Sequence, residues 1–398
     1  MVRPIELLFN DLNKIITLIK EEKGPHALIY SDDADGISSA IILSLLLDRF
    51  SCSYKFICLD KFYPELVPDI LNIVDGLIFI LDIGGPIYKF IPDEFKSRVI
   101  IFDHHQEHLE IPSDILYVNP HRYGFKEDQI PPTSVLTYML YRLLDRSSAM
   151  KWAWLALIGI GELTYELQGL NWTILYDGLK AKCIVKSDHG FKICYGGIKK
   201  DYKSLYKDIT LVISVGYFES ELPIRIIPYI IRGDYHRIHE LAVRYSEVRK
   251  RAFNNLLSIL EKEGLLVKES IQWFEDFNQD FYNMGTRVFD SFTTYVAHQS
   301  RLLDKFKYLI GLQLRNPYIP GFGYLTMDWI NIAVRVPKAL EVKIVTKKAQ
   351  PVSALIEAST IPLGGLGYGY ETKGAGVIPY AEKEEFIRLF NELASGSI

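Results

Sequence analysis

Residues 99–105 read VIIFDHH, an apolar run that ends abruptly in one acid and two imidazoles. The apolar part is typical of a buried β-strand. Asp103, His104 and His105 are side chains that bind protons or metal ions, so a buried strand that ends on all three indicates a chemical site. Such a site requires partner side chains from elsewhere in the chain.

Three further apolar runs end in polar or acidic residues: HALIY (26–30), GLIFIL (76–81) and ILYV (115–118). The carboxyl ends of parallel strands meet at one edge of a sheet, where ligands bind. We therefore expect the acids and imidazoles that follow the four strands to lie along one edge. These residues are Asp33, Asp35, Asp82, Asp103, His104 and His105.

So many carboxylates would repel one another unless cations lay between them. Oxygen ligands together with imidazole favour Mn²⁺ or Mg²⁺ over a structural zinc ion with thiolate ligands. Two-metal phosphoester sites often have one carboxylate that bridges ions about 3.5–4 Å apart, and Asp82 is the candidate for that bridge. Taken singly, Asp35 before Gly36 is equally typical of a turn or a helix N-cap. The hypothesis therefore rests on the combination of strand ends.

Apolar spacing predicts helices at 37–50, 132–145 and 151–167, between and after these strands. Strands that are apolar throughout and alternate with helices predict an α/β fold, in which a parallel sheet carries helices on both faces. A chain of 398 residues is long for a single core and predicts more than one domain.

The later sequence changes character twice. Residues 168–230 have mixed runs that indicate an insertion with some β content, and 235–265 are typical of a long charged helix. From about 306 the segments KYLIGLQL, NIAVRV and LEVKIVT (340–346) indicate strands again. The predicted division is a parallel-sheet domain over 1–167, an insertion and connecting helical region over 168–305, and a smaller α/β domain over 306–398.

Composition excludes some functions. Lys and Arg number 45 against 49 Asp and Glu, so the chain lacks the basic excess of a protein that coats DNA. Its four Cys form no CxxC pair, which argues against a structural zinc site or a disulfide framework. No apolar run reaches the roughly 18 residues of a membrane span, and the amphipathic N-terminus is unlike a signal peptide. We expect a soluble cytoplasmic protein without a membrane partner.

At the level of motifs, SDDADGISSA (31–40), ILDIG (80–84) and FDHH (102–105) resemble the first three motifs of the DHH phosphoesterase superfamily. NPHRYGF (119–125) and PPTSVLTYMLYRLL (131–144) resemble the segments that follow in its RecJ-like nuclease branch.

The C-terminal part shows a further resemblance to the domain that accompanies DHH in these proteins. GGLGYGYETKGAGVIPYAEKEEFIRLF (364–390) is similar to its Gly-rich end, and IAVRVP (332–337) is similar to its arginine-bearing strand. The resemblance implies two domains with the substrate strand in the cleft between them. It also implies metal-dependent phosphodiester hydrolysis with up to two Mn²⁺ or Mg²⁺ ions.

The resemblance assigns roles residue by residue. Asp103 would support the site and His105 would face the scissile phosphate. The implied metal ligands are Asp33, Asp35, Asp82, His104 and, in the fourth motif, Glu162. The implied phosphate or nucleic-acid contacts are His121, Arg122, Arg335, Gly364 and Gly365.

Three positions depart from the family pattern. Ser31 stands where the family has a metal-binding His, and a hydroxyl is a poor substitute for imidazole. Glu162 is the nearest candidate for the final Asp ligand. The GGGH-type signature of the C-terminal domain lacks its His, since Gly367 and Tyr368 stand there.

The sequence therefore leaves two main hypotheses. The first is a RecJ-like exonuclease that cleaves single-stranded DNA or RNA in DNA replication or repair. The second is a catalytically weak or inactive RecJ-like scaffold of a replicative helicase complex, with GINS, MCM or a helicase as partner. A lesser hypothesis is a phosphoesterase acting on very short oligonucleotides or nucleoside bisphosphates.

Overall fold

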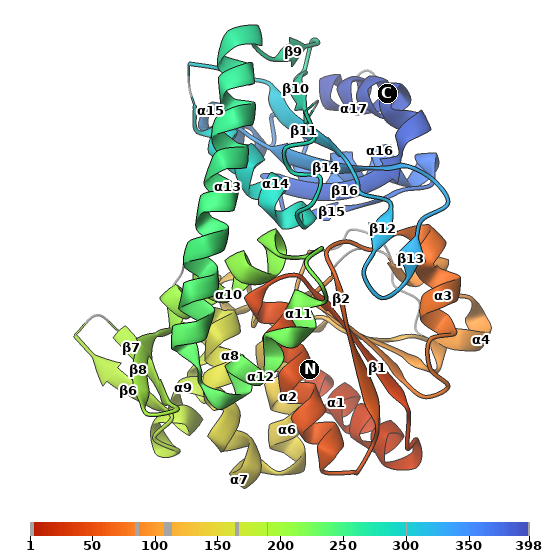
Figure 1. Ribbon diagram of the computed structural model, residues 1–398. Coiled ribbons are helices and arrows are strands. Elements are labelled where there is room, and N and C mark those ends of the chain that lie inside the picture. Colours follow the sequence, from red (N-terminus) through yellow and green to blue (C-terminus); the bar gives the residue numbers. More distant parts are fainter. Residues whose placement is uncertain are drawn as a thin grey trace.

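The computed structural model shows two lobes joined by a long helix (Figure 1). The described residues are 4–83, 87–106, 114–163, 167–188, 190–276, 278–299 and 301–396. None of the helices in these ranges combines the length and apolar character needed to cross a lipid bilayer.

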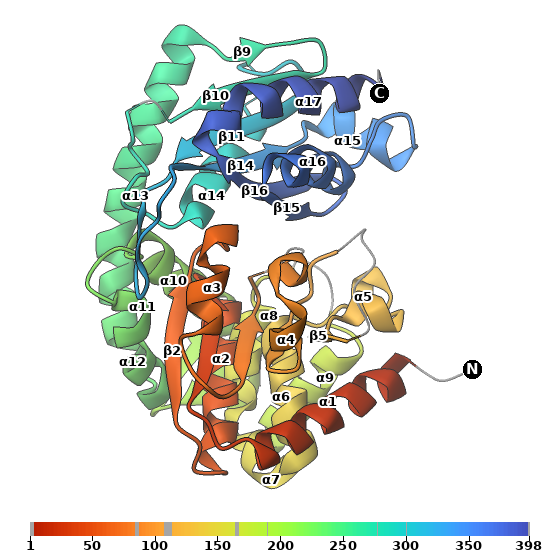
Figure 2. The same cartoon turned by 90° about the vertical axis from the view of Figure 1, so that its right-hand side faces the viewer.

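The N-terminal lobe contains a five-stranded parallel sheet in the order β2-β1-β3-β4-β5. Its strands are β1 (His26–Ser31), β2 (Tyr54–Leu59), β3 (Ile78–Leu81), β4 (Val99–Phe102) and β5 (Leu116–Val118). This confirms the predicted α/β class and the predicted parallel sheet. Because all strands run in the same direction, their carboxyl ends form one edge that faces the second lobe (Figure 2).

Both faces of this sheet are covered, because the side chains of each strand alternate between two cores. Leu28 and Tyr30 of β1 pack in one core, and Ala27 and Ile29 pack in the other. The first core is covered by α1 (Pro4–Glu21), α2 (Ala34–Asp48), α6 (Thr133–Leu144) and α8 (Ala153–Ile160). The second lies beneath α3 (Val67–Leu71), α4 (Asp93–Lys96) and the hairpin of β12 (Tyr318–Ile319) and β13 (Gly323–Tyr324). The predicted helix over 151–167 is shorter than expected, since α8 ends before Gly161.

The middle of the chain packs on the N-terminal lobe and then rises to the second lobe. Its elements are α9 (Leu170–Lys180), β6 (Ile184–Ser187), β7 (Gly190–Tyr195), β8 (Ile198–Asp201), α10 (Tyr202–Val215), α11 (Leu222–Arg225), α12 (Ile227–Arg232) and α13 (Tyr235–Glu263). The predicted β content is the three-stranded sheet β6-β7-β8, which projects from one side (Figure 1). Helix α13 is the predicted long charged helix, and it runs alongside both lobes.

The second lobe is built on a six-stranded sheet in the order β15-β16-β14-β11-β10-β9. The strands are β9 (Leu266–Val267), β10 (Ile271–Glu275), β11 (Tyr308–Leu314), β14 (Trp329–Arg335), β15 (Leu366–Gly369) and β16 (Lys373–Pro379). Its helices are α14 (Thr286–Ala297), α15 (Lys338–Val345), α16 (Val352–Thr360) and α17 (Lys383–Ser395). Since β9 and β10 pair within this sheet, the lobe begins well before the predicted boundary at 306.

One predicted strand of this lobe is wrong. The segment 340–346 is rich in β-branched residues, which favours an extended strand, but it belongs to α15. Leu340 and Ile344 are its buried side chains. Their spacing of four residues places them on one helix face, and Pro337 directly precedes the first helical residue. Burial of this face outweighs the local β preference.

A buried ion pair joins the two lobes. Asp60 follows β2 of the first lobe, and its carboxylate pairs with Arg315, which follows β11 of the second lobe. Both side chains are completely shielded from solvent. The same Asp60 carboxylate accepts a hydrogen bond from the backbone N–H of Thr286 at 3.0 Å, and Arg315 Nε donates to Tyr63 Oη at 3.1 Å. This network determines how α14 and the second sheet face the strand ends.

Removing one partner of this pair would leave an uncompensated buried charge. We expect Asp60→Asn to lower the free energy of unfolding by about 3–5 kcal/mol, measured by urea denaturation. Arg388→Met is the matched control, because Arg388 pairs with Glu385 and Glu392 on the exposed face of α17. The control is expected to leave the urea midpoint nearly unchanged. An unchanged midpoint for Asp60→Asn would contradict the role of the pair.

Candidate metal centre and cleft

Asp33 follows β1 at the strand edge, and both oxygens of its carboxylate contact other groups of the chain. Its Oδ1 caps α2 by accepting from Gly36 N at 2.8 Å, and Ser31 Oγ lies 3.1 Å from the same oxygen. Its Oδ2 forms an ion pair with Arg287 from the first turn of α14. The Arg287 Nε atom also lies 3.8 Å from Asp32 Oδ1. Asp33 is therefore neutralised by groups of the chain itself.

Asp35 caps a different helix. Its two carboxylate oxygens accept from the backbone N–H groups of Thr133 (2.8 Å) and Ser134 (3.0 Å), which open α6. Gly159 allows this close approach, because a Cβ there would lie 2.1 Å from Asp35 Oδ1. Burial, followed by the charge of Asp33, raises the pKa of Asp35 to about 7. The predicted ligand Asp35 is thus held by a helix N-terminus, which is a favourable place for an acid.

Asp82 lies at the centre of the site, directly after β3. Its backbone has a left-handed φ of 61°, a conformation that Asp tolerates better than most residues. Ser31 Oγ donates to Asp82 Oδ2 at 2.9 Å and Thr133 Oγ1 donates to Oδ1 at 3.1 Å. Burial, with the nearby charge of Asp33, raises the pKa of Asp82 well above its usual range. An unpaired ionised carboxylate is costly here, so a cation would be bound favourably.

The two imidazoles after β4 differ in charge state. His104 Nε2 lies 3.4 Å from Asp82 Oδ1, and burial together with the charge of His105 lowers the pKa of His104 to about 4. His105 Nδ1 lies 2.7 Å from Asp103 Oδ1. Burial lowers the pKa of His105, but the charge of Asp103 outweighs it and the net shift is upward. His104 is therefore neutral at pH 7, whereas the pairing with Asp103 favours the protonated form of His105.

These groups fit one metal ion. The ligand atoms of Asp82, His104 and His105 all lie within 4.8 Å of one another, and this is the one such group among the described residues. Glu162 lines the same cavity. Burial raises its pKa, but the nearby basic groups, including Arg287 and Lys373, outweigh burial and the net shift is downward. The Asp82 carboxylate, the neutral His104 imidazole and the adjacent Glu162 carboxylate are donors that suit Mn²⁺ or Mg²⁺. The position beside Asp33 does not fit a second ion, since its carboxylate is already used.

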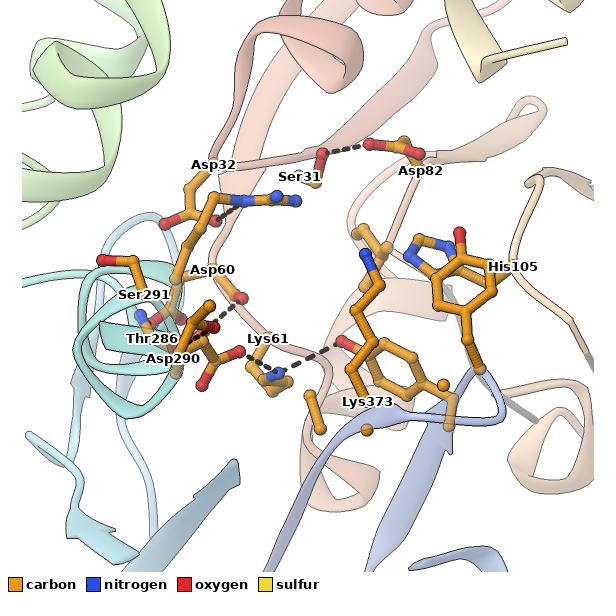
Figure 3. A pocket seen from close by; sticks show the side chains of 18 of the residues that line it. Ser31, Asp32, Asp60, Lys61, Asp82, His105, Thr286, Asp290, Ser291 and Lys373 are labelled. Atoms are coloured by element: carbon orange, nitrogen blue, oxygen red, sulfur yellow. Dashed lines mark hydrogen bonds and ion pairs between the residues drawn. The ribbon is translucent and has the colours of Figure 1, made fainter. Parts of the chain in front are cut away.

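The centre opens into a cleft of about 250 Å³ between the lobes (Figure 3). Ser31, Asp82 and His105 line it from the strand ends, and Arg287 and Lys373 line it from the second lobe. The remaining charged side chains of its lining are Asp32, Asp60, Lys61, Glu162, Asp290 and Arg335.

Aromatic rings and lysines face the imidazoles across the cleft. The rings of Tyr368 and Tyr370 lie 5.5 Å and 5.8 Å from the His105 ring, measured between centroids. Lys61 Nζ donates to Tyr368 Oη at 3.1 Å, and Lys373 Nζ lies 4.7 Å from the Tyr370 ring centroid. Tyr368 stands where the family pattern has a His, so its phenol occupies a place next to His105.

The predicted phosphate contacts are distributed unevenly. Arg335 lines the cleft, but its guanidinium donates to Thr294 Oγ1 (2.7 Å) and to the carbonyls of Val334, Gly374 and Asp290. It therefore holds β14, β16 and α14 together. Its contact with phosphate stays a prediction.

Four other predicted contacts lie outside the lining of the cleft. His121 Nε2 lies 3.1 Å from the carbonyl oxygen of His104, and Arg122 donates to the Tyr117 carbonyl at 2.7 Å. Gly364 and Gly365 precede β15, where a Cβ on Gly365 would lie 2.1 Å from the Val377 carbonyl oxygen. Gly365 is thus explained by close strand packing.

Sequence reasoning missed several cleft residues. Asp60 and Lys61 directly follow β2, so the strand-end rule that found Asp82 would also have found them. Lys373 lies within the Gly-rich stretch and could have been flagged as a phosphate ligand. Arg287 had no sequence signal, because only the folded chain brings α14 to Asp33.

Comparison with known families agrees with this geometry. The family model described as "DHH family, N-terminal domain" matches residues 27–160. This part of the chain is a DHH domain. It contains the parallel sheet, the ligands Asp82 and His104, and the α6 helix start that holds Asp35. A comparison with curated proteins found no match.

Solved structures show that the whole chain has a RecJ-like fold. RecJ from Thermus thermophilus in complex with Mn²⁺ is similar with a TM-score of 0.59 and 14% identity, over 98% of this chain and 54% of that chain. An exonuclease RecJ bound to manganese has a TM-score of 0.54 and 15% identity, over 98% and 94%. CDC45 from Entamoeba histolytica has a TM-score of 0.54 and 8% identity, over 97% and 99%. The chain thus spans about half the length of the Thermus RecJ, and at these identities only the fold is shared.

The contrast between the two imidazoles of the DHH domain is testable by NMR titration of the metal-free protein. We expect His105 to titrate above its ordinary pKa of 6.5 and its pKa to fall in Asp103→Asn, since burial is then opposed only by the smaller effect of Glu162. Because the folded pKa is raised, the pair stabilises the fold below pH 6.5, and this contribution is lost as pH rises through the folded pKa. His104 should stay neutral at about pH 5.5 in both proteins. An unchanged His105 titration in the variant would contradict the pairing.

Proposed function

We propose that the chain hydrolyses phosphodiester bonds of single-stranded nucleic acid, with one divalent cation held at the DHH centre. The observation that carries this proposal is the group formed by Asp82, His104 and His105 on the floor of a cleft whose opposite wall presents Lys373 and two tyrosines. A bound Mn²⁺ or Mg²⁺ ion would polarise the phosphate and lower the pKa of a coordinated water.

The chain's own residues complete the chemistry. Asp82 and neutral His104 would hold the ion, with Glu162 close enough to contribute. Asp103 fixes the orientation of His105 through Nδ1, which leaves Nε2 for the substrate. His105, whose pKa is raised by Asp103, would donate to an oxygen of the scissile phosphate. Burial of these groups excludes bulk water and strengthens their electrostatic effect.

The second lobe fits a nucleic-acid end. Lys373 supplies positive charge for the phosphates, and the rings of Tyr368 and Tyr370 can stack on bases. The cleft volume of about 250 Å³ suits a terminal nucleotide rather than a duplex. This supports an exonuclease of DNA or RNA that works in DNA replication or repair in the cytoplasm.

A second candidate function is favoured by the metal position beside Asp33. Ser31 and Arg287 neutralise that carboxylate without any ion. A chain that has lost one metal position could act as a RecJ-like scaffold, with GINS, MCM or a helicase as partner. The likeness of its fold to CDC45 is compatible with this role.

Cleavage of end-labelled single strands under a Mn²⁺ titration distinguishes the two candidates. We expect Mn²⁺-stimulated cleavage that falls by at least about 100-fold in Asp82→Asn, since a metal ligand is lost. Asn tolerates the left-handed backbone of residue 82, so the variant should fold. Asp93→Asn, an exposed carboxylate on α4, is the control and should cleave normally. Intact strands at millimolar Mn²⁺ would favour the scaffold.

The role of the second lobe is tested by Lys373→Ala. Removal of a charge that faces the substrate phosphate should raise KM for the single strand by about 10-fold and change kcat much less. The control is Lys338→Ala, because Lys338 is exposed on α15. A variant with unchanged KM would show that the strand does not pass Lys373.

A further inference from the structure

We propose that the guanidinium of Arg287 permanently replaces the second divalent cation, so that this DHH centre is a single-ion site with a built-in positive charge. The inference rests on the proposed function, because it concerns the same centre. It goes further because it assigns Arg287 of α14 to the metal-binding arrangement. This residue is far from every DHH motif in the sequence, although its side chain contacts Asp33.

Arg287 is positioned by a fully buried network. The preceding residue, Thr286, donates through its backbone N–H to Asp60 Oδ2 at 3.0 Å and through its hydroxyl to the Asp60 carbonyl at 2.9 Å. Asp60 is in turn paired with Arg315. The start of α14 is therefore anchored to the end of β2, and Arg287 projects from it toward the strand edge.

The charges beside Arg287 require a cation. Asp33 is fully buried and Asp32 is 2% exposed. Asp33 Oδ2 accepts no hydrogen bond in the described structure, so its ion pair with Arg287 is its compensation. Arg287 Nε also lies 3.8 Å from Asp32 Oδ1. The guanidinium fork suits this task, since it can face two carboxylates at once.

Ser31 uses the remaining ligand positions. Its hydroxyl lies between the two carboxylates that an ion would bridge, 3.1 Å from Asp33 Oδ1 and 2.9 Å from Asp82 Oδ2. Asp33 Oδ1 also accepts from Gly36 N. Both oxygens of Asp33 are thus engaged, one of them by a positive charge. Asp82 Oδ1 accepts a hydrogen bond from the neutral Thr133 hydroxyl and lies 3.4 Å from His104 Nε2, so it is the oxygen that can still face an ion. The lack of a side chain at Gly36 leaves room for the Ser31 hydroxyl, since a Cβ there would lie 2.2 Å from Ser31 Oγ.

A fixed guanidinium differs chemically from a metal ion. It cannot ionise a bound water, but it can donate a fork of hydrogen bonds to a phosphate. Arg287 is one-third exposed and lines the cleft, so part of it faces the substrate space. The centre would therefore need one ion to activate water, and chelators would remove only that ion.

The test is the Mn²⁺ stoichiometry, measured by isothermal titration calorimetry and by EPR of bound Mn²⁺, without substrate. We expect one ion for the wild type and for Arg287→Lys, which keeps the charge. We expect two ions for Arg287→Gln, because the Asp33 carboxylate is released. The double variant Ser31→His/Arg287→Gln should bind the second ion at least about 10-fold more tightly than Arg287→Gln, since it regains an imidazole ligand. Asp82→Asn should bind none.

The outcomes separate the two proposals. Two ions in the wild type would overturn this inference and leave the proposed function intact. One ion in a folded Arg287→Gln variant, with unchanged circular dichroism and urea midpoint, would also overturn it. No ion in the wild type or in any variant would overturn the proposed function together with this inference. If the double variant fails to fold, the comparison of Arg287→Gln with Arg287→Lys still decides the question.

Discussion

The burial of negative charge at one sheet edge is the constraint on which the rest of the site depends. Asp33, Asp35, Asp82 and Asp103 are all 2% exposed or less, and each buried carboxylate costs several kcal/mol unless it is compensated. The compensation differs at each position. Asp35 accepts hydrogen bonds from the N-terminus of α6, Asp33 pairs with the Arg287 guanidinium, and Asp103 pairs with the His105 imidazole. Asp82 is left with hydroxyl donors and neutral His104, which is why it is the place for a metal ion.

This compensation draws on all parts of the chain. The α6 helix start belongs to the DHH domain, Arg287 comes from α14 of the second lobe, and Lys373 comes from the last sheet. The DHH motifs supply the buried carboxylates, but distant segments supply the positive charges that lie beside them. A change in α14 can thus alter the chemistry of the centre while every motif residue stays in place.

The sequence predicted the strand-end residues well, because a parallel sheet brings carboxyl ends to one edge whatever its loops do. The apolar run VIIF (99–102) coincides with β4, and the order of strands and helices in the first lobe followed from apolar spacing. The strand predicted over 340–346 was wrong, because only the packing of α15 in the second lobe shows that Leu340 and Ile344 share a buried face. The pairings of Arg287 with Asp33 and of Arg315 with Asp60 each span more than 250 residues. No periodicity encodes contacts over such separations, so they could not be predicted.

The buried Asp60–Arg315 pair has a kinetic consequence. It ties the two lobes together at the base of the cleft, so opening them would expose both charges and break the contacts of Thr286 and Tyr63. Hinge closure is therefore a poor candidate for a slow step. A ligand would enter a cleft whose two walls are already in place, so little of its binding energy would be spent on bringing the lobes together.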